Sequence, residues 1–308
     1  MSLGHNQHHH SHGELTRNAA FASVGMALFL LALKTYAAAE TGSVALLGSL
    51  ADTAFDVLAS LLTLFSVRYA ARPADDDHRF GHGKAEALSA LVQVMLVVIS
   101  AVLIGWRAAE RLGSGESTQH PEMGIGVSLI AIFATLALLS YQRSVVRRTG
   151  SVAIQGDHLH YQGDLLLNIA VIIAIAVESF LQVRGADPIF GIGIAIWLLY
   201  GASQSAKLAL AQLLDREWPQ EKRDRFLAVA ARHPKMHTIH DVRTRSSGMH
   251  DFVQFHVWFD PEMTLREVHQ VMDEVEDELA REFPGVEVMI HPEPEGQGMD
   301  HPHEHQLP

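Results

Sequence analysis

The chain contains no cysteine among its 308 residues. Disulfide bonds and thiolate ligands are therefore excluded, so any bound metal ion would be held by imidazole nitrogen and by oxygen. Basic residues are also scarce, with 23 lysines and arginines against 35 aspartates and glutamates. The net charge of −12 argues against nucleic acid as a partner, because nucleic-acid-binding surfaces are basic. The sequence also lacks an HExxH motif, and we expect no enzymatic activity.

Six apolar stretches occupy residues 15–214. They run approximately over Asn18–Ala39, Val44–Tyr69, Ala85–Trp106, Met123–Tyr141, Gln155–Leu181 and Phe190–Ala211. Most of them are long enough, at about 1.5 Å per residue, to cross a hydrocarbon core of about 30 Å as helices. The sequence therefore predicts an α-helical membrane domain with six transmembrane helices in a lipid bilayer.

Basic residues in the connections predict the orientation of this domain. The first connection, 40–43, has none, and the fifth has one, whereas the second and fourth each have three: Arg72, Arg79 and Lys84, and Arg143, Arg147 and Arg148. The third is ambiguous, since its two arginines lie close to the membrane. Because basic loops stay in the cytoplasm, we expect the even connections and both termini to be cytoplasmic.

Two polar pairs interrupt these apolar stretches. Asp52 and Asp56 are four residues apart in the second span, and His160 and Asp164 have the same spacing in the fifth. Residues four apart lie on one face of a helix, so each helix would present two ligands to one interface. An intramembrane carboxylate is costly, roughly 2.5–3.5 kcal/mol on insertion scales, and needs a partner.

Three carboxylates and one imidazole suit a four-coordinate divalent metal ion, with Zn²⁺ the natural choice. The ligand set also admits Fe²⁺, Cd²⁺, Co²⁺ and Mn²⁺. The alternative is a buried polar group satisfied by other helices without any metal. One such pair is weak support for a metal site, and two pairs on separate spans are strong support.

Residues 215–295 are polar and predict a soluble domain. A helix is expected from Pro219 to before Pro234, and strands over His237–Arg245 and Asp251–Phe259, with a turn at 246–248. A capping box of Thr264 with Glu267 opens a further helix through Phe283, and a last strand follows from Val286. The apolar stripe of that helix is expected to comprise Leu265, Val268, Met272, Val275 and Leu279. The order α-β-β-α-β indicates a two-layer unit with helices on one face of a sheet.

A family resemblance is carried by three features of the sequence. These are the Asp–Asp and His–Asp pairs of the second and fifth spans, the segment PADDDHRFGHGKAEALSAL, and the sequence LLDR at the end of the last span. With these motifs the chain resembles the cation diffusion facilitators, most closely the bacterial subgroup that exports zinc and ferrous iron. The resemblance covers about residues 15–293. It implies a ferredoxin-like cytoplasmic domain, a homodimer and a location in the bacterial inner membrane.

The resemblance also implies further metal sites. Spacing alone leaves Asp75, His78 and His82 as either a ligand set or a solvated polar loop, and relatives bind a second metal ion here. In the cytoplasmic domain, family positions are matched by His240, His256, His269 and His291, which implies a binuclear site at a dimer interface. Relatives have an aspartate two residues after the last histidine, where this chain has Glu293. Lys84 and Asp215 match a salt bridge between the membrane and soluble parts.

These residues predict a mechanism as well as a site. Metal ions and protons would compete for the intramembrane quartet, so an inward proton gradient would drive metal efflux by antiport. Metal bound at the cytoplasmic sites would favour the dimer and regulate transport. The alternative is a membrane-anchored metal sensor or assembly scaffold without transport. Histidine-rich tails are expected to be disordered at 1–14 and 296–308, and they are either metal-gathering segments or remnants of cloning.

Overall fold

The computed structural model describes residues 5–41, 44–114, 122–181, 186–236, 238–248 and 250–296. The chain divides into two units. One is Ser11–Leu213, and the other is Leu214–Pro308 together with Met1–His10. Each unit has its own packing.

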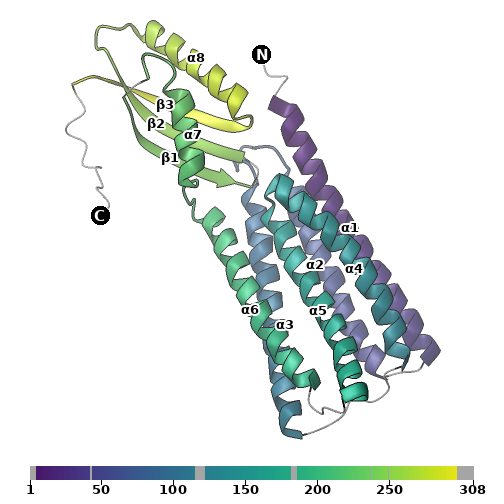
Figure 1. Cartoon of the computed structure of the whole chain (residues 1–308). Coiled ribbons are helices and arrows are strands. Elements are labelled where there is room, and N and C mark those ends of the chain that lie inside the picture. The colour runs from purple at the N-terminus through teal and green to yellow at the C-terminus, as the bar shows by residue number, and fades with distance from the viewer. Residues whose placement is uncertain are drawn as a thin grey trace. The chain divides into compact units, whose positions relative to one another are not determined.

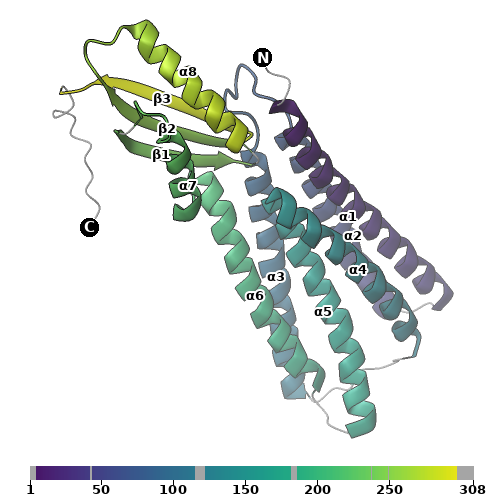
Figure 2. The same ribbon diagram turned by 45° about the horizontal axis from the view of Figure 1, so that its top comes forward.

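Six long helices make up the first unit and run side by side as a bundle (Figures 1 and 2). Their bounds are α1 His5–Thr41, α2 Val44–Ala70, α3 Lys84–Ser114, α4 Glu122–Thr149, α5 Val152–Leu181 and α6 Ala186–Leu213. Each contains one predicted span, so the six-helix prediction is confirmed. Helices α3 and α4 run further than predicted, because nothing in the sequence stops a helix where it leaves the apolar layer.

In this bundle, large apolar side chains lie on the surface and small ones lie inside, as is typical of membrane proteins. Phe55, Phe65, Trp106, Phe133 and Tyr200 are exposed on its surface, whereas many buried positions are alanine. Small residues inside let helices approach closely, and large apolar residues face lipid. Among the described residues, α1, α2, α3, α4 and α6 each contain a segment long and apolar enough to cross a membrane. Helix α5 carries the polar pair in its first half, and several side chains of its second half lie outside the described part.

Helix α1 begins at His5 and therefore includes residues 5–14, which composition alone assigns to a tail. Adding a residue to an existing helix costs little compared with nucleating a new one, so the first span can extend toward the N-terminus. The C-terminal tail, apart from Gly296, lies outside the described residues.

The second unit has the predicted element order. It consists of α7 Gln220–Ala230, β1 Ile239–Ser247, β2 His250–Phe259, α8 Leu265–Glu282 and β3 Val286–Pro294. Strand β2 is central, antiparallel to β1 and parallel to β3. Strand β1 continues two residues beyond its predicted end, because Gly248 adopts a φ of +62° and Ser247 pairs directly with His250 across a tight turn.

One face of this sheet packs on both helices. Alternate β2 side chains, Val253, Phe255, Val257 and Phe259, are buried there with α7 and α8. The capping box of Thr264 and Glu267 is present. The predicted stripe is wrong at its first position, since Leu265 is 79% exposed. Val271, which the prediction left out, is buried in the core. The helix begins at Leu265, where its first turn extends beyond the edge of the core.

Candidate metal sites

The polar pairs of α2 and α5 meet inside the bundle. His160 Nε2 lies 3.0 Å from Asp56 Oδ1 and 3.6 Å from Asp164 Oδ2. One ligand atom from each of the three residues lies within 4.8 Å of the others. Asp52 lies one turn before Asp56 on α2, and its side chain is outside the described part. The structure therefore brings together the three predicted ligands whose side chains it describes.

The spacing of these atoms fits a metal ion. Bonds of about 2.0–2.2 Å in a tetrahedral site place neighbouring ligand atoms about 3.3–3.6 Å apart. The separations from His160 Nε2, 3.0 and 3.6 Å, are close to this range. The same nitrogen faces both carboxylates, so one cation between them could contact all three. The donor set of imidazole and carboxylate suits Zn²⁺ and does not exclude other divalent ions of the first transition row.

Hydrogen bonds hold the backbone around this cluster. Tyr161, which follows His160, is fully buried and donates to the carbonyl oxygen of Ser23 on α1 at 2.9 Å. Its hydroxyl oxygen lies 3.0 Å from Ser60 Oγ of α2, and Ser60 is the donor because the tyrosine proton is already used. Also near the ligands, Lys34 of α1 donates to Thr53 of α2 at 2.6 Å. Tyr161 thus ties α5 to α1 and α2, and the Lys34 contact ties α1 to α2 on the other side of Asp56.

A second cluster lies in the connection between α2 and α3. Asp75 Oδ2 is 3.3 Å from His82 Nε2, and Asp75 Oδ1 is 3.3 Å from His78 Nδ1. Gly81, with a φ of +75°, turns the chain so that His82 returns toward the membrane unit, where its ring packs edge-on against Tyr69. A backbone hydrogen bond from His78 lowers the pKa of Asp75, which keeps this carboxylate ionised. The three predicted residues are thus assembled by a loop.

A third cluster lies on the open face of the sheet. His256 Nδ1 is 2.9 Å from Glu293 Oε1, and His240 Nε2 is 3.2 Å from Glu293 Oε2. His240 and His256 are cross-strand partners on β1 and β2. Glu293 follows on β3, two residues beyond the position paired with His256. Glutamate at this position therefore reaches both histidines, even though Pro292 precedes it.

Trp258 is a residue of this cluster that sequence reasoning missed. Its indole Nε1 donates to Glu293 Oε2 at 3.1 Å, and its ring lies 4.5 Å from that of His240, centroid to centroid. Burial alone would raise the pKa of Glu293, but hydrogen bonds from His256, Trp258 and His240 outweigh it and lower that pKa. The period-2 pattern of β2 could have placed Trp258 on the face that carries His256.

Asp241 was also missed. It lies at a bulge in β1 with a φ of +43°, where the pairing with β2 shifts between His240 and Arg243. This conformation brings Asp241 Oδ2 to 3.7 Å from His256 Nε2, so both ring nitrogens of that histidine face carboxylates. A bulge cannot be located from alternation in a single strand, and bulges are common beside functional sites.

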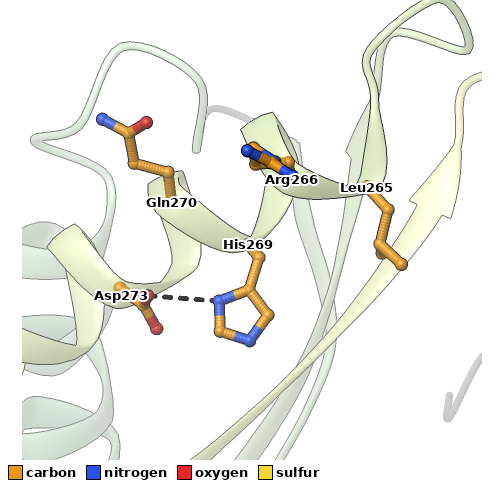
Figure 3. Close-up of a pocket in the computed structure, with 5 residues that line it drawn as sticks. All are labelled: Leu265, Arg266, His269, Gln270 and Asp273. Atoms are coloured by element: carbon orange, nitrogen blue, oxygen red, sulfur yellow. Dashed lines mark hydrogen bonds and ion pairs between the residues drawn. The ribbon is translucent and has the colours of Figure 1, made fainter.

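The remaining two predicted histidines occupy different places. His291 lies beside the sheet cluster, with its ring 4.7 Å from that of His256. His269 does not join the cluster in the same chain, because α8 packs on the opposite face of the sheet. It lines a shallow pocket with Leu265, Arg266, Gln270 and Asp273, where it lies 3.1 Å from Asp273 Oδ2 (Figure 3).

The predicted pair of Lys84 with Asp215 joins residues of the two units, and it stays a prediction. Within the membrane unit, Lys84 Nζ donates to the carbonyl oxygen of Leu213 at 3.3 Å. Within the other unit, Asp215 Oδ1 lies 4.0 Å from Arg245 Nη1. Asp215 also has a positive φ of +52°, a conformation that non-glycine residues rarely adopt.

Comparison with known proteins assigns the chain to a family. Residues 20–214 match the model of the cation efflux transmembrane domain, and residues 218–295 match that of the cation efflux protein cytoplasmic domain. Cation-efflux pump FieF of Yersinia pestis (strain Pestoides F) is 44% identical over 276 residues, 90% of this chain and 92% of its own length. FieF of Yersinia pseudotuberculosis serotype O:3 (strain YPIII) gives the same values.

A solved structure of CzrB in its zinc form is 34% identical and covers 27% of this chain and 96% of its own, with a TM-score of 0.26. The family assignment rests on the two domain models and on the full-length relatives. Both domain models match consecutively along one chain, and the three clusters described above lie within the matched residues. The chain therefore belongs to the cation diffusion facilitator family, whose members are cation efflux transporters and not enzymes.

Proposed function

We propose that this protein exports zinc from the bacterial cytoplasm in exchange for protons, using Asp52, Asp56, His160 and Asp164 as the transport site. The observation that carries the proposal is the convergence of His160 Nε2 with Asp56 and Asp164 inside an apolar bundle. Uncompensated carboxylates are expensive in a membrane, and those that occur there mark ion pathways. The FieF relatives are named cation-efflux pumps, which supports transport as the activity.

Exchange with protons follows from the chemistry of the ligands. A divalent cation binds carboxylates and imidazole in their deprotonated forms, so metal binding releases any protons that these groups carry. If the site opens alternately to the two sides of the membrane, each metal ion leaving must be replaced by protons entering. The proton gradient across the inner membrane then drives zinc outward. The basic residues of the second and fourth connections support cytoplasmic termini.

The cytoplasmic clusters have a regulatory role in this proposal. His240, His256 and Glu293 would bind zinc on the open face of the sheet, with His291 beside them. His269 cannot reach this face within its own chain, but it is exposed and could do so from a second copy in a homodimer. Zinc that bridges two copies would bind the dimer better than the monomer, and it would thereby shift the population toward the dimer. The loop cluster of Asp75, His78 and His82 would hold a further ion.

Replacing Asp56 with alanine separates a transporter from a metal sensor. We expect zinc flux into proteoliposomes to be lost, because His160 loses its 3.0 Å carboxylate partner. Zinc binding by the cytoplasmic clusters, measured by calorimetry on the same purified full-length variant, should persist, because their residues lie on other segments. If zinc flux of the variant equals that of the wild type, Asp56 is not a transport ligand and the proposal is wrong.

A further inference from the structure

A seam of buried polar side chains runs from the transport cluster toward one end of the bundle. This end is defined by the last residues of α2 and α4 and by the first residues of α3 and α5, and is called here the α2–α3 end. The seam lies where α2, α3 and α5 meet. Its members are Ser60 and Thr63 of α2, Glu86, Ser89 and Gln93 of α3, and Ser151 just before α5, with the backbone of α5 at Gly156 beside them.

Helical spacing makes the seam continuous. On α2, Ser60 and Thr63 follow Asp56 at intervals of four and three residues, so they lie on the same face as that ligand. On α5, Gly156 comes one turn, about 6 Å, before His160. On α3, Glu86, Ser89 and Gln93 repeat at three and four residues, again forming one face.

Gln93 is the point where the three helices meet. Its side-chain amide donates to Thr63 Oγ1 of α2. Its other terminal atom, Oε1, faces α5, since a Cβ atom at Gly156 would lie 2.6 Å from it. Only 1% of Gln93 is exposed. The seam is therefore closed here by direct contact between the polar end of Gln93 and the backbone of α5.

Hydrogen bonding along the seam is incomplete. Within the described residues, neither Gln93 Oε1 nor Ser89 Oγ has a hydrogen-bond partner, and Ser89 is only 3% exposed. Buried polar atoms without partners are rare and costly, and each needs an explanation. At the α2–α3 end, by contrast, the buried Glu86 is paired, because Ser151 donates to its Oε2 at 2.5 Å. The unpartnered atoms therefore lie between this pair and the transport site.

The seam is more deeply buried than the ligands themselves. The side chains of Asp56 and His160 are 16% and 15% exposed, and that of Asp164, one turn further from the α2–α3 end, is 31% exposed. Toward the α2–α3 end the side chains of the seam are buried. The site is therefore closed toward the α2–α3 end.

We propose that this seam is the closed form of the route by which a hydrated divalent cation reaches the transport site from the α2–α3 end. When α3 moves away from α2 and α5, Ser89, Gln93 and Thr63 would line a polar passage, with Glu86 at its mouth. Their oxygens would then replace part of the water shell of the ion. The proposal rests on the proposed transport function and adds the residues along the path.

The absence of cysteine allows a direct test by single-cysteine substitution. Ser89→Cys is nearly isosteric, and Gln93→Cys lies deeper in the seam. Vesicles that transport zinc under an imposed pH gradient would be treated with a quaternary-ammonium methanethiosulfonate on the side of the α2–α3 end. Both thiols should be modified, because a thiol in a wetted passage can ionise and react. The matched control is Met95→Cys, two residues beyond Gln93 on the exposed side of α3, which should stay unmodified in lipid.

A second variant tests the route by function. Gln93→Leu keeps a similar volume and removes the polar groups, so zinc flux should fall about tenfold, equivalent to one or two lost hydrogen bonds to the ion in the passage. Zinc affinity at the transport site should be unchanged. If wild-type protein transports zinc while Ser89→Cys and Gln93→Cys stay unmodified, or Gln93→Leu transports at the wild-type rate, this inference is overturned. If wild-type protein moves no metal, the proposed function itself fails.

Discussion

Replacing His160 with alanine is expected to lower zinc flux more than a hundredfold. His160 supplies the only imidazole of the proposed site, and its Nε2 faces both Asp56 and Asp164. Loss of residues that merely orient metal ligands costs roughly 10–100-fold, and loss of a ligand should cost at least as much. The variant also leaves two carboxylates facing each other without a donor between them. Zinc uptake into proteoliposomes, at matched protein content, measures the effect.

The chain offers a matched control two residues earlier on α5. His158 is also half-buried, but its Nδ1 lies 3.2 Å from Gln142 Oε1 of α4, and it is not part of the ligand cluster. His158→Ala should retain most of the flux. Equal loss of flux in the two variants would mean that α5 tolerates no such change, and the ligand role of His160 would then lack support.

The second large effect is expected in the cluster of His240, His256 and Glu293 on the sheet. Glu293→Ala should weaken zinc binding there more than a hundredfold, because both Glu293 oxygens face histidines, at 2.9 and 3.2 Å. Trp258→Phe keeps the ring beside His240 and removes only the hydrogen bond to Glu293 Oε2. Since such outer partners orient metal ligands, we expect a loss of about tenfold from that change.

Calorimetric zinc titration of the full-length protein measures both changes, with Asp164→Ala and Asp75→Ala together as the background so that neither the transmembrane site nor the loop cluster contributes. Glu287→Ala is the control. Glu287 is an exposed carboxylate on the same strand, and its position number differs from that of Glu293 by an even number, so the two residues share one face of the strand. It should bind zinc like the background protein. A Glu293→Ala variant with unchanged affinity would exclude this cluster as a zinc site.

Helical periodicity made the membrane cluster predictable. A spacing of four residues in two apolar stretches is enough to place Asp56, His160 and Asp164 on faces that can meet, and the structure shows them in contact. The α-β-β-α-β order was also readable, because the alternation in β2 and the capping box at Thr264 are local signals. In both cases the information lies within one element.

Features that depend on contacts between elements were not predictable. Asp241 approaches His256 only because β1 bulges, and Trp258 reaches Glu293 only because β3 pairs in parallel with β2. His269 matches a metal-ligand position of the family, but it lies on α8, which packs on the face of the sheet opposite the cluster. Leu265 fits the apolar spacing of α8 and is nevertheless exposed. Spacing within a helix does not reveal how far the neighbouring core extends.

The buried seam shows the same limit inside the membrane. Ser89 and Gln93 occur in an apolar span, and their spacing alone does not indicate a route to the transport site. Their significance comes from the neighbours that they meet, Thr63 on α2 and Gly156 on α5, and from the atoms left without a hydrogen bond. None of these contacts is encoded by a local pattern.

The most direct test of proton-coupled zinc export is zinc flux into proteoliposomes under an imposed pH gradient, for wild type and Asp164→Ala. Zinc entry requires proton exit in an antiporter, so an acidic lumen should accelerate wild-type zinc uptake and an alkaline lumen should slow it. Asp164→Ala should show no gradient-driven uptake, because the site loses a carboxylate ligand. Wild-type uptake that is indifferent to the gradient, or equal uptake by both proteins, would contradict the account.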